Sequence, residues 1–158
     1  MKTTKLTLIL PLILTITACS QGETTKPQQS NHQSYTEEEI AKMSTDEKQQ
    51  KTTEYIDKAI PKAFSDVEYN SQIDDYNVTI NLFVKGAGKK AKAAMEGDDA
   101  KWEKVTDKFN ELSKNIYEYA TRLEPDKTVT LALLDDEDKF TTLIVSINND
   151  VVYEINGE

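Results

Sequence analysis

The strongest constraint on the fold is a stripe of apolar residues whose spacing alternates between three and four positions. Its members are Trp102, Val105, Phe109, Leu112, Ile116, Tyr119 and Leu123. This spacing places all of them on one face of an α-helix, which buries the stripe against another layer. We therefore predict a helix over residues 99–123, with Asp98 or Asp99 as its N-cap. Gly97 is expected to break the pattern before this helix, and Pro125 to end it.

A shorter apolar stripe predicts a second helix, from about residue 45. The stripe consists of Ile56, Ile60, Ala63 and Phe64. Upstream, Thr36 and Glu39 have the spacing of a capping box, which predicts a short helical turn. Pro61 lies inside the stripe, so we expect the longer helix to kink or split there.

Alternation of apolar and polar residues predicts a half-buried strand over residues 76–84. Four further strands are expected at residues 67–69, 128–134, 140–147 and 151–155, with loops at 70–75 and 135–138 and a tight turn at 148–150. Short turns between sequential strands favour antiparallel pairing. The sequence thus predicts an α+β fold, a mostly antiparallel sheet of four to five strands packed on two amphipathic helices.

The N-terminus carries the pattern of an export signal. Two lysines precede the apolar run Leu6–Ile16, which is too short to cross ~30 Å of hydrocarbon. The run leads into Ile16-Thr17-Ala18-Cys19. This tetrapeptide resembles the lipobox of bacterial lipoproteins, in which an aliphatic residue, a small residue and Ala or Gly precede the cysteine. The resemblance implies that the signal is cleaved after Ala18 and that Cys19 is diacylated with palmitate-type chains.

The resemblance and the composition divide the chain into three parts. Residues 1–18 are expected to be the lipoprotein signal peptide, residues 19–34 a disordered tether and residues 35–158 a single α+β domain. Residues 20–34 contain no aliphatic, Phe, Tyr or Trp side chain, so they cannot bury enough surface to offset the entropy of ordering. The implied location is the extracytoplasmic side of a bacterial cell membrane, in a bacterium that we expect to be Gram-positive, with the lipid on Cys19 as the anchor.

The charge of the chain excludes one class of partner. It carries 28 acidic and 19 basic residues, for a formal net charge of −9. Proteins that bind nucleic acid need a basic surface to displace counterions from phosphates. We therefore predict no nucleic-acid partner, and membrane attachment through the lipid rather than through charge.

Residues able to perform nucleophilic catalysis are scarce. Cys19 would be consumed by lipidation and the only histidine, His32, lies in the expected tether, so no Cys-His or Ser-His arrangement is available. The sequence contains no Ser-x-x-Lys motif. We predict that the protein is not an enzyme, and that it has no catalytic residue, no metal site and no cofactor.

Two patterns keep other interpretations open. Gly86–Ala91 loosely matches the dinucleotide fingerprint G-x-G-x-x-G/A, but the βαβ context and the acidic ribose ligand are missing, so a flexible connector is expected. Acidic clusters at Asp74-Asp75, Asp98-Asp99 and Asp135–Asp138 could in principle supply carboxylates for catalysis on wall material. Their positions in turns favour solvated caps instead.

The second face of the sheet is the best candidate for a functional surface. If the apolar positions of residues 76–84 pack on the helices, Thr79, Asn81 and Phe83 point the other way. Depending on the register of the sheet, Thr130, Thr142, Ile144 and Val152 join them. A face of Thr and Asn with a few apolar anchors suits the binding of a protein partner.

The favoured hypothesis is a binding or interaction module at the cell envelope, whose partner is an envelope or secreted protein. The alternatives are a carboxylate-dependent enzyme on wall material and a spacer or inhibitor with no small-molecule site.

Overall fold

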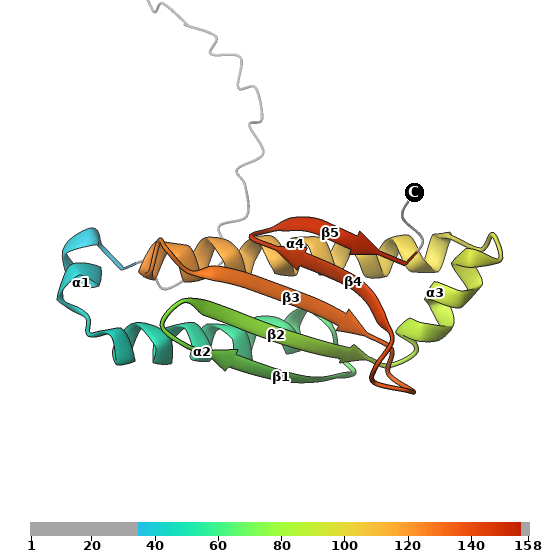
Figure 1. Ribbon diagram of the computed structural model, residues 1–158, viewed down its shortest axis with the longest axis horizontal. Coiled ribbons are helices and arrows are strands. Elements are labelled where there is room, and N and C mark those ends of the chain that lie inside the picture. Colours follow the sequence, from blue (N-terminus) through green and yellow to red (C-terminus); the bar gives the residue numbers. More distant parts are fainter. Residues whose placement is uncertain (1–34, 156–158) are drawn as a thin grey trace, which may run out of the picture. The chain divides into compact units, whose positions relative to one another are not determined.

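The computed structural model describes residues 35–155 and has an α+β fold, as the sequence predicts (Figure 1). The expected signal peptide and tether lie outside these residues. The described chain contains four helices and five strands: α1 (Glu37–Lys42), α2 (Thr45–Ala63), β1 (Val67–Ile73), β2 (Asn77–Val84), α3 (Ala87–Met95), α4 (Ala100–Leu123), β3 (Thr128–Leu134), β4 (Thr142–Ile147) and β5 (Asp150–Glu154). Of these helices, none is long and apolar enough to cross a bilayer.

The five strands form one sheet in the order β1-β2-β3-β4-β5. Three of the four pairings are antiparallel, and β2 and β3 pair in parallel because α3 and α4 carry the chain back between them. Helices α2 and α4 lie side by side behind the sheet, and Figure 1 shows no described element in front of it. The fold is therefore a two-layer structure with one open sheet face.

The core lies between the helices and the sheet. From the sheet it takes every second residue of β2 and β3, and from α4 the predicted stripe. Its largest side chains with almost no exposed surface are Ile56, Ile60, Ile80, Leu82, Phe109, Ile116, Leu131, Leu133, Leu143 and Ile144. Tyr119 belongs to the predicted stripe but is only half-buried, and its ring stacks on Tyr55 with the centroids 4.1 Å apart.

Most predicted helix ends are confirmed. The Thr36 hydroxyl accepts a hydrogen bond from the Glu39 backbone N–H, and the Glu39 carboxylate accepts one from the Thr36 N–H. Asp99 is the N-cap of α4, and Gly97 ends the preceding helical stretch with a φ of +95°. The predicted split at Pro61 is wrong, because α2 continues through Pro61 to Ala63.

Several strand ends differ from the prediction. β1 is longer than predicted, because residues 70–73 pair with β2 instead of forming a loop. Tyr76, predicted on the buried face, lies in the turn and is 75% exposed. Phe140, predicted to start β4, is 89% exposed. The predicted tight turn is confirmed, with Asn148 and Asn149 both at positive φ between β4 and β5.

The predicted placement of Ile144 on the open face is wrong. Leu134 pairs with Thr142 and Leu133 with Ile144, so Leu143 is an extra residue in β4. This β-bulge interrupts the period of two. Thr142 therefore faces away from the helices as predicted, whereas Ile144 turns into the core with 1% of its surface exposed.

Candidate functional site

The open face of the sheet is uncharged across its three central strands. The residues of β2, β3 and β4 that point away from the helices are Asn77, Thr79, Asn81, Phe83, Thr128, Thr130, Ala132, Leu134, Thr142, Val145 and Ile147. Nearly a third of the chain is charged, yet among the strand residues that point to this face the only charged ones are on the edge strands, Glu68 and Asp150. A charge-depleted patch within a charged surface is typical of a protein interface.

The half of the open face over β1, β2 and the start of β3 is polar. The parallel register places Thr79 beside Thr130, and the antiparallel register places it beside Gln72. The Asn81 side-chain amide donates to the Asn70 side-chain oxygen at 3.0 Å. Side-chain hydroxyls and amides that face solvent in this way can donate and accept hydrogen bonds to a bound partner.

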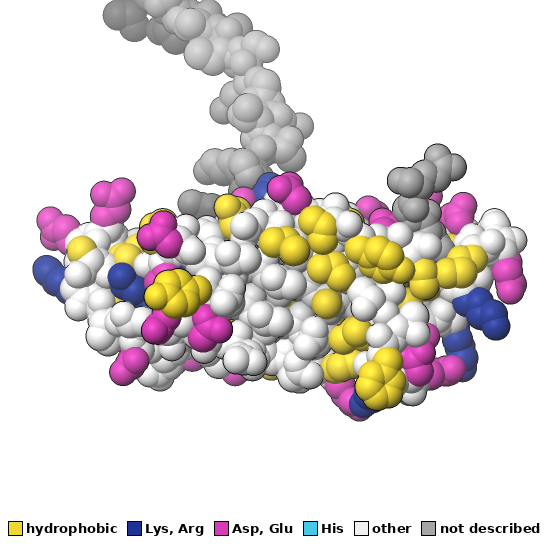
Figure 2. Space-filling model, in the orientation of Figure 1, with side chains coloured by type: hydrophobic (Ala, Val, Ile, Leu, Met, Phe, Trp, Pro, Cys, Tyr) yellow, Lys and Arg dark blue, Asp and Glu magenta, His cyan; other side chains and the backbone are white. Residues whose placement is uncertain are grey.

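The half of the open face over β4 and β5 is apolar. Figure 2 shows yellow side chains gathered over these two strands, with white polar surface beside them. In the register of the strands, Ala132, Val145 and Tyr153 lie in one row across the face. Ile147 is 39% exposed and Tyr153 is 45% exposed. These two side chains are the apolar anchors of the face, in the place that the sequence analysis assigned to Ile144.

Phe83 occupies one end of the open face. It stands opposite Glu68 on β1, and the Lys139 ammonium lies 5.3 Å from the centre of its ring. Lys139 also pairs with Glu68 at 2.6 Å. Phe83 is thus half-covered by a cation–π contact and an ion pair, while Thr79 and Asn81 have no such cover. The structure therefore brings Thr79, Asn81 and Phe83 together on one face as predicted, and removes Ile144 from it.

The glycine motif after β2 holds a carboxylate of the protein itself. Asp136, in the loop between β3 and β4, accepts hydrogen bonds from the backbone N–H groups of Gly86 (2.8 Å) and Gly88 (3.3 Å). Burial works to raise the pKa of Asp136, but these two N–H groups, its own backbone N–H and the charge of Lys89 together hold the pKa below its usual value. Lys89 pairs with Glu137 of the same loop at 3.1 Å. The motif is therefore a docking point for the acidic loop.

Other carboxylates of the acidic clusters also accept hydrogen bonds that stabilise turns. The backbone N–H groups of Tyr76 and Asn77 donate to Asp74 at 2.8 Å and hold the pKa of that carboxyl below its usual range. The Thr141 hydroxyl and backbone N–H do the same for the pKa of Asp138. Within residues 35–155, no group of three or more acidic, His or Cys side chains is arranged to hold a metal ion.

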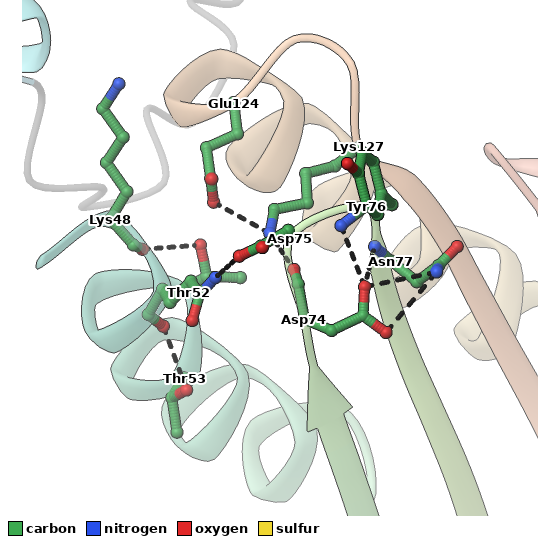
Figure 3. Close-up of polar contacts among 10 residues, drawn as sticks. Lys48, Thr52, Thr53, Asp74, Asp75, Tyr76, Asn77, Glu124 and Lys127 are labelled. Carbon is green, nitrogen blue, oxygen red and sulfur yellow. Dashed lines mark hydrogen bonds and ion pairs between the residues drawn. The ribbon is translucent and has the colours of Figure 1, made fainter. Parts of the chain in front are cut away.

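A buried lysine joins the turns at the opposite end of the sheet (Figure 3). Lys127, 4% exposed, pairs with Glu124 at 3.3 Å, and its ammonium donates to the backbone carbonyl of Asp74. On the neighbouring Asp75, the carboxylate accepts a hydrogen bond from Gln49 of α2 at 3.4 Å. The cluster ties α2 and the end of α4 to the β1–β2 turn, which is a structural role.

The sequence analysis missed the residues that make the face apolar. The strands that carry Val145, Ile147 and Tyr153 are interrupted by bulges at Leu143 and Val152. Alternation counted from the first residue of each strand therefore assigns these side chains to the wrong face of the sheet. A count backwards from the Asn148-Asn149 turn would have placed Ile147 and Val145 together.

Comparison with known protein families, with curated proteins and with solved structures finds no match to this chain.

Proposed function

We propose that the protein is a lipid-anchored extracytoplasmic bacterial lipoprotein, and that it acts as a binding module at the cell envelope through the open face of its sheet. The partner is an envelope or secreted protein. The lipobox-like sequence Ile16-Thr17-Ala18-Cys19 supports the anchor. The observation that carries the binding role is the open face itself, which no described element covers and which has no charged side chain on its three central strands.

The chemistry of this face suits a protein partner. Ile147 and Tyr153 supply exposed apolar surface, and burying such surface is worth about 25 cal/mol per Å². Thr79, Thr130 and Asn81 supply hydrogen-bonding groups beside it. A partner that matches both halves would lose little energy in desolvating charge, since the three central strands present no charged side chain to this face.

The anchor is tested by the mass of the mature N-terminus. We expect the wild-type chain to begin at Cys19 and to carry the mass of acyl chains, and the Cys19→Ser variant to lack them. Equal masses at the mature N-terminus of the two proteins would contradict the anchor, without bearing on the open face.

The binding face is tested with matched lysine substitutions on opposite layers. Asn81→Lys places a charge in the middle of the open face, and Asn110→Lys places the same charge on the exposed surface of α4. Both variants are made in the mature chain with Cys19→Ser and used as bait on envelope and secreted fractions. We expect Asn81→Lys to lose about tenfold or more of the captured partner, because the new charge must be desolvated at the interface.

The control is chosen so that folding and binding are separated. Both variants should melt within a few degrees of the parent, since each adds a charge at a solvent-facing position. Equal capture by Asn81→Lys, Asn110→Lys and the parent would overturn the proposed face.

A further inference from the structure

The edge strand β1 presents unpaired backbone groups. Asp74 N–H donates to Asn77 C=O, and Lys85 N–H to Asp66 C=O, each at 3.0 Å. In an antiparallel ladder every second residue bonds to the partner strand, so the even-numbered residues of β1 bond to β2. The N–H and C=O groups of Val67, Tyr69, Ser71 and Ile73 therefore point outward, where β1 is the border of the described sheet (Figure 1).

Apart from the charge of Glu68, this edge lacks the features that normally prevent edge-to-edge pairing. Natural edge strands carry lysine, proline or a bulge, or are short. β1 pairs with β2 over seven consecutive residues without a bulge, and residues 69–73 include no charge and no proline. The opposite edge is protected: β5 is bulged at Val152 and has Asp150 and Glu154 at its ends.

The sequence of β1 is complementary to itself in the antiparallel register centred on Asn70. With Asn70 opposite its own copy, all seven residues of β1 pair. The residues whose backbone N–H and C=O groups point outward then lie opposite one another, Tyr69 with Ser71 and Val67 with Ile73. On the open face, Glu68 meets Gln72, and no like charges meet. The register with Ser71 on the axis instead puts Glu68 opposite Asp74, which is unfavourable. For β5, full self-pairing would put Asp150 opposite Glu154.

We propose that two copies of this chain associate through β1 in the Asn70-centred register, forming one continuous sheet. The two-fold axis is then perpendicular to the sheet, so both open faces lie on the same side. If the module is anchored and binds through that face, as proposed above, the dimer presents two binding faces at once and gains avidity. The pairing itself does not depend on that function.

The register is tested with cysteine pairs in the mature chain with Cys19→Ser, which has no other cysteine. Asn70 would face its own copy in a non-hydrogen-bonded pair with Cα atoms ~4.5 Å apart, a separation that a disulfide can span. The two Gln72 residues would lie about 13 Å apart along the strands, which is too far. We expect Asn70→Cys to form a disulfide-linked dimer under mild oxidation and Gln72→Cys to stay monomeric on a denaturing gel.

Two lysine variants of the same Cys19→Ser chain test the same register, with the strength of dimerisation measured by sedimentation. Asn70→Lys brings two ammonium groups together on the axis and should weaken the dimer about fivefold or more. Gln72→Lys brings each ammonium opposite Glu68 of the other copy and should tighten it by about the same factor. A parent that sediments as a monomer at every concentration, equal effects of the two lysines, or crosslinking of Gln72→Cys in preference to Asn70→Cys would each overturn the proposal.

Discussion

Ile144 and Val145 are neighbours in β4 whose side chains leave the strand on opposite sides. Ile144 is buried under the helices, whereas Val145 lies in the row of Ala132 and Tyr153 on the open face. The bulge at Leu143 decides this assignment, because it shifts every following residue by one position. One extra residue therefore separates a core position from an interface position.

Truncation of Ile144 should be costly for stability. Ile144→Ala removes buried methyl groups and leaves a cavity, so we expect the free energy of unfolding in urea to fall by about 2–5 kcal/mol. Ile147→Ala, on the open face, should cost less than about 1 kcal/mol. Similar losses for the two variants would contradict the assignment of faces.

Substitution of Lys127 should lower the stability of the protein, because it leaves the partners of the ammonium group unpaired. Lys127→Met keeps most of the volume but leaves Glu124 and the Asp74 carbonyl without their donor, so we expect a loss of about 3 kcal/mol. Adding Glu124→Gln should recover part of that loss, because the uncompensated charge is gone. Strictly additive losses in chemical denaturation would show that the ion pair has no such role.

At the scale of residues, the sequence predicts burial well where one period holds without interruption. The apolar positions of β2 and of α4 up to Ile116 are buried as predicted. Prediction fails at Tyr76 and Phe140, because turns anchored by Asp74 and Asp138 take them out of the strands. Whether an aspartate makes such a turn depends on the local backbone, which hydrophobic periodicity does not describe.

The acidic β3–β4 loop and the N-terminus of α3 form one unit at the scale of elements. Gly86, with φ +75°, makes the turn into α3, and Gly88 lies against the Asp135 side chain. A Cβ on Gly88 would approach a carboxylate oxygen of Asp135 to 2.2 Å. The need for glycine at this position therefore arises from packing of the loop.

Gly88→Ala should destabilise the protein through this single contact. We expect a loss of about 1–3 kcal/mol, since Asp135 is held by its hydrogen bond from the Glu137 N–H and must move. In an Asp135→Ala background the same substitution should cost much less. If the two losses simply add in a double-mutant cycle by thermal denaturation, the contact is not the cause.

The Asp136 contact predicts how stability depends on pH. Its folded pKa lies below the usual 3.8, so the unfolded chain takes up the proton first as the pH falls. The stabilisation is present above that value and is lost as the pH drops through the folded pKa. Asp136→Asn should therefore show a shallower fall in unfolding free energy below pH 3.8 than the parent. Parallel profiles would contradict this contribution.

At the scale of elements, the sequence predicts α1, α2, α4 and the number of strands. The flexible connector expected at Gly86–Ala91 is wrong, because Ala87–Met95 form helix α3, and not all strand pairings are predicted. Among the strands of residues 35–155, only the β2–β3 pair is parallel, and it follows from a connection long enough to return the chain to the same end. The docking of residues 135–138 on Gly86–Gly88 joins segments about fifty positions apart. No local pattern contains that information.

In the folded molecule, residue 35 lies on the helical layer. The Arg122 side chain of α4 donates a hydrogen bond to the Tyr35 carbonyl. Desolvation of the Tyr119 ring, together with the charge of Tyr35, raises the pKa of the Tyr119 hydroxyl to about 12. Tyr35 is thus hydrogen-bonded to α4, which packs on the face of the sheet opposite to the open face.

Photo-crosslinking in living cells tests the proposed binding role most directly. A photoreactive residue is placed at Asn81 on the open face, and in a second strain at Asn110 on α4. The account predicts one discrete crosslinked protein from Asn81, which disappears when Ile147→Lys is added, and none from Asn110. Crosslinks of the same protein from Asn110, or none from Asn81, would contradict the claim that this chain binds through its open sheet face.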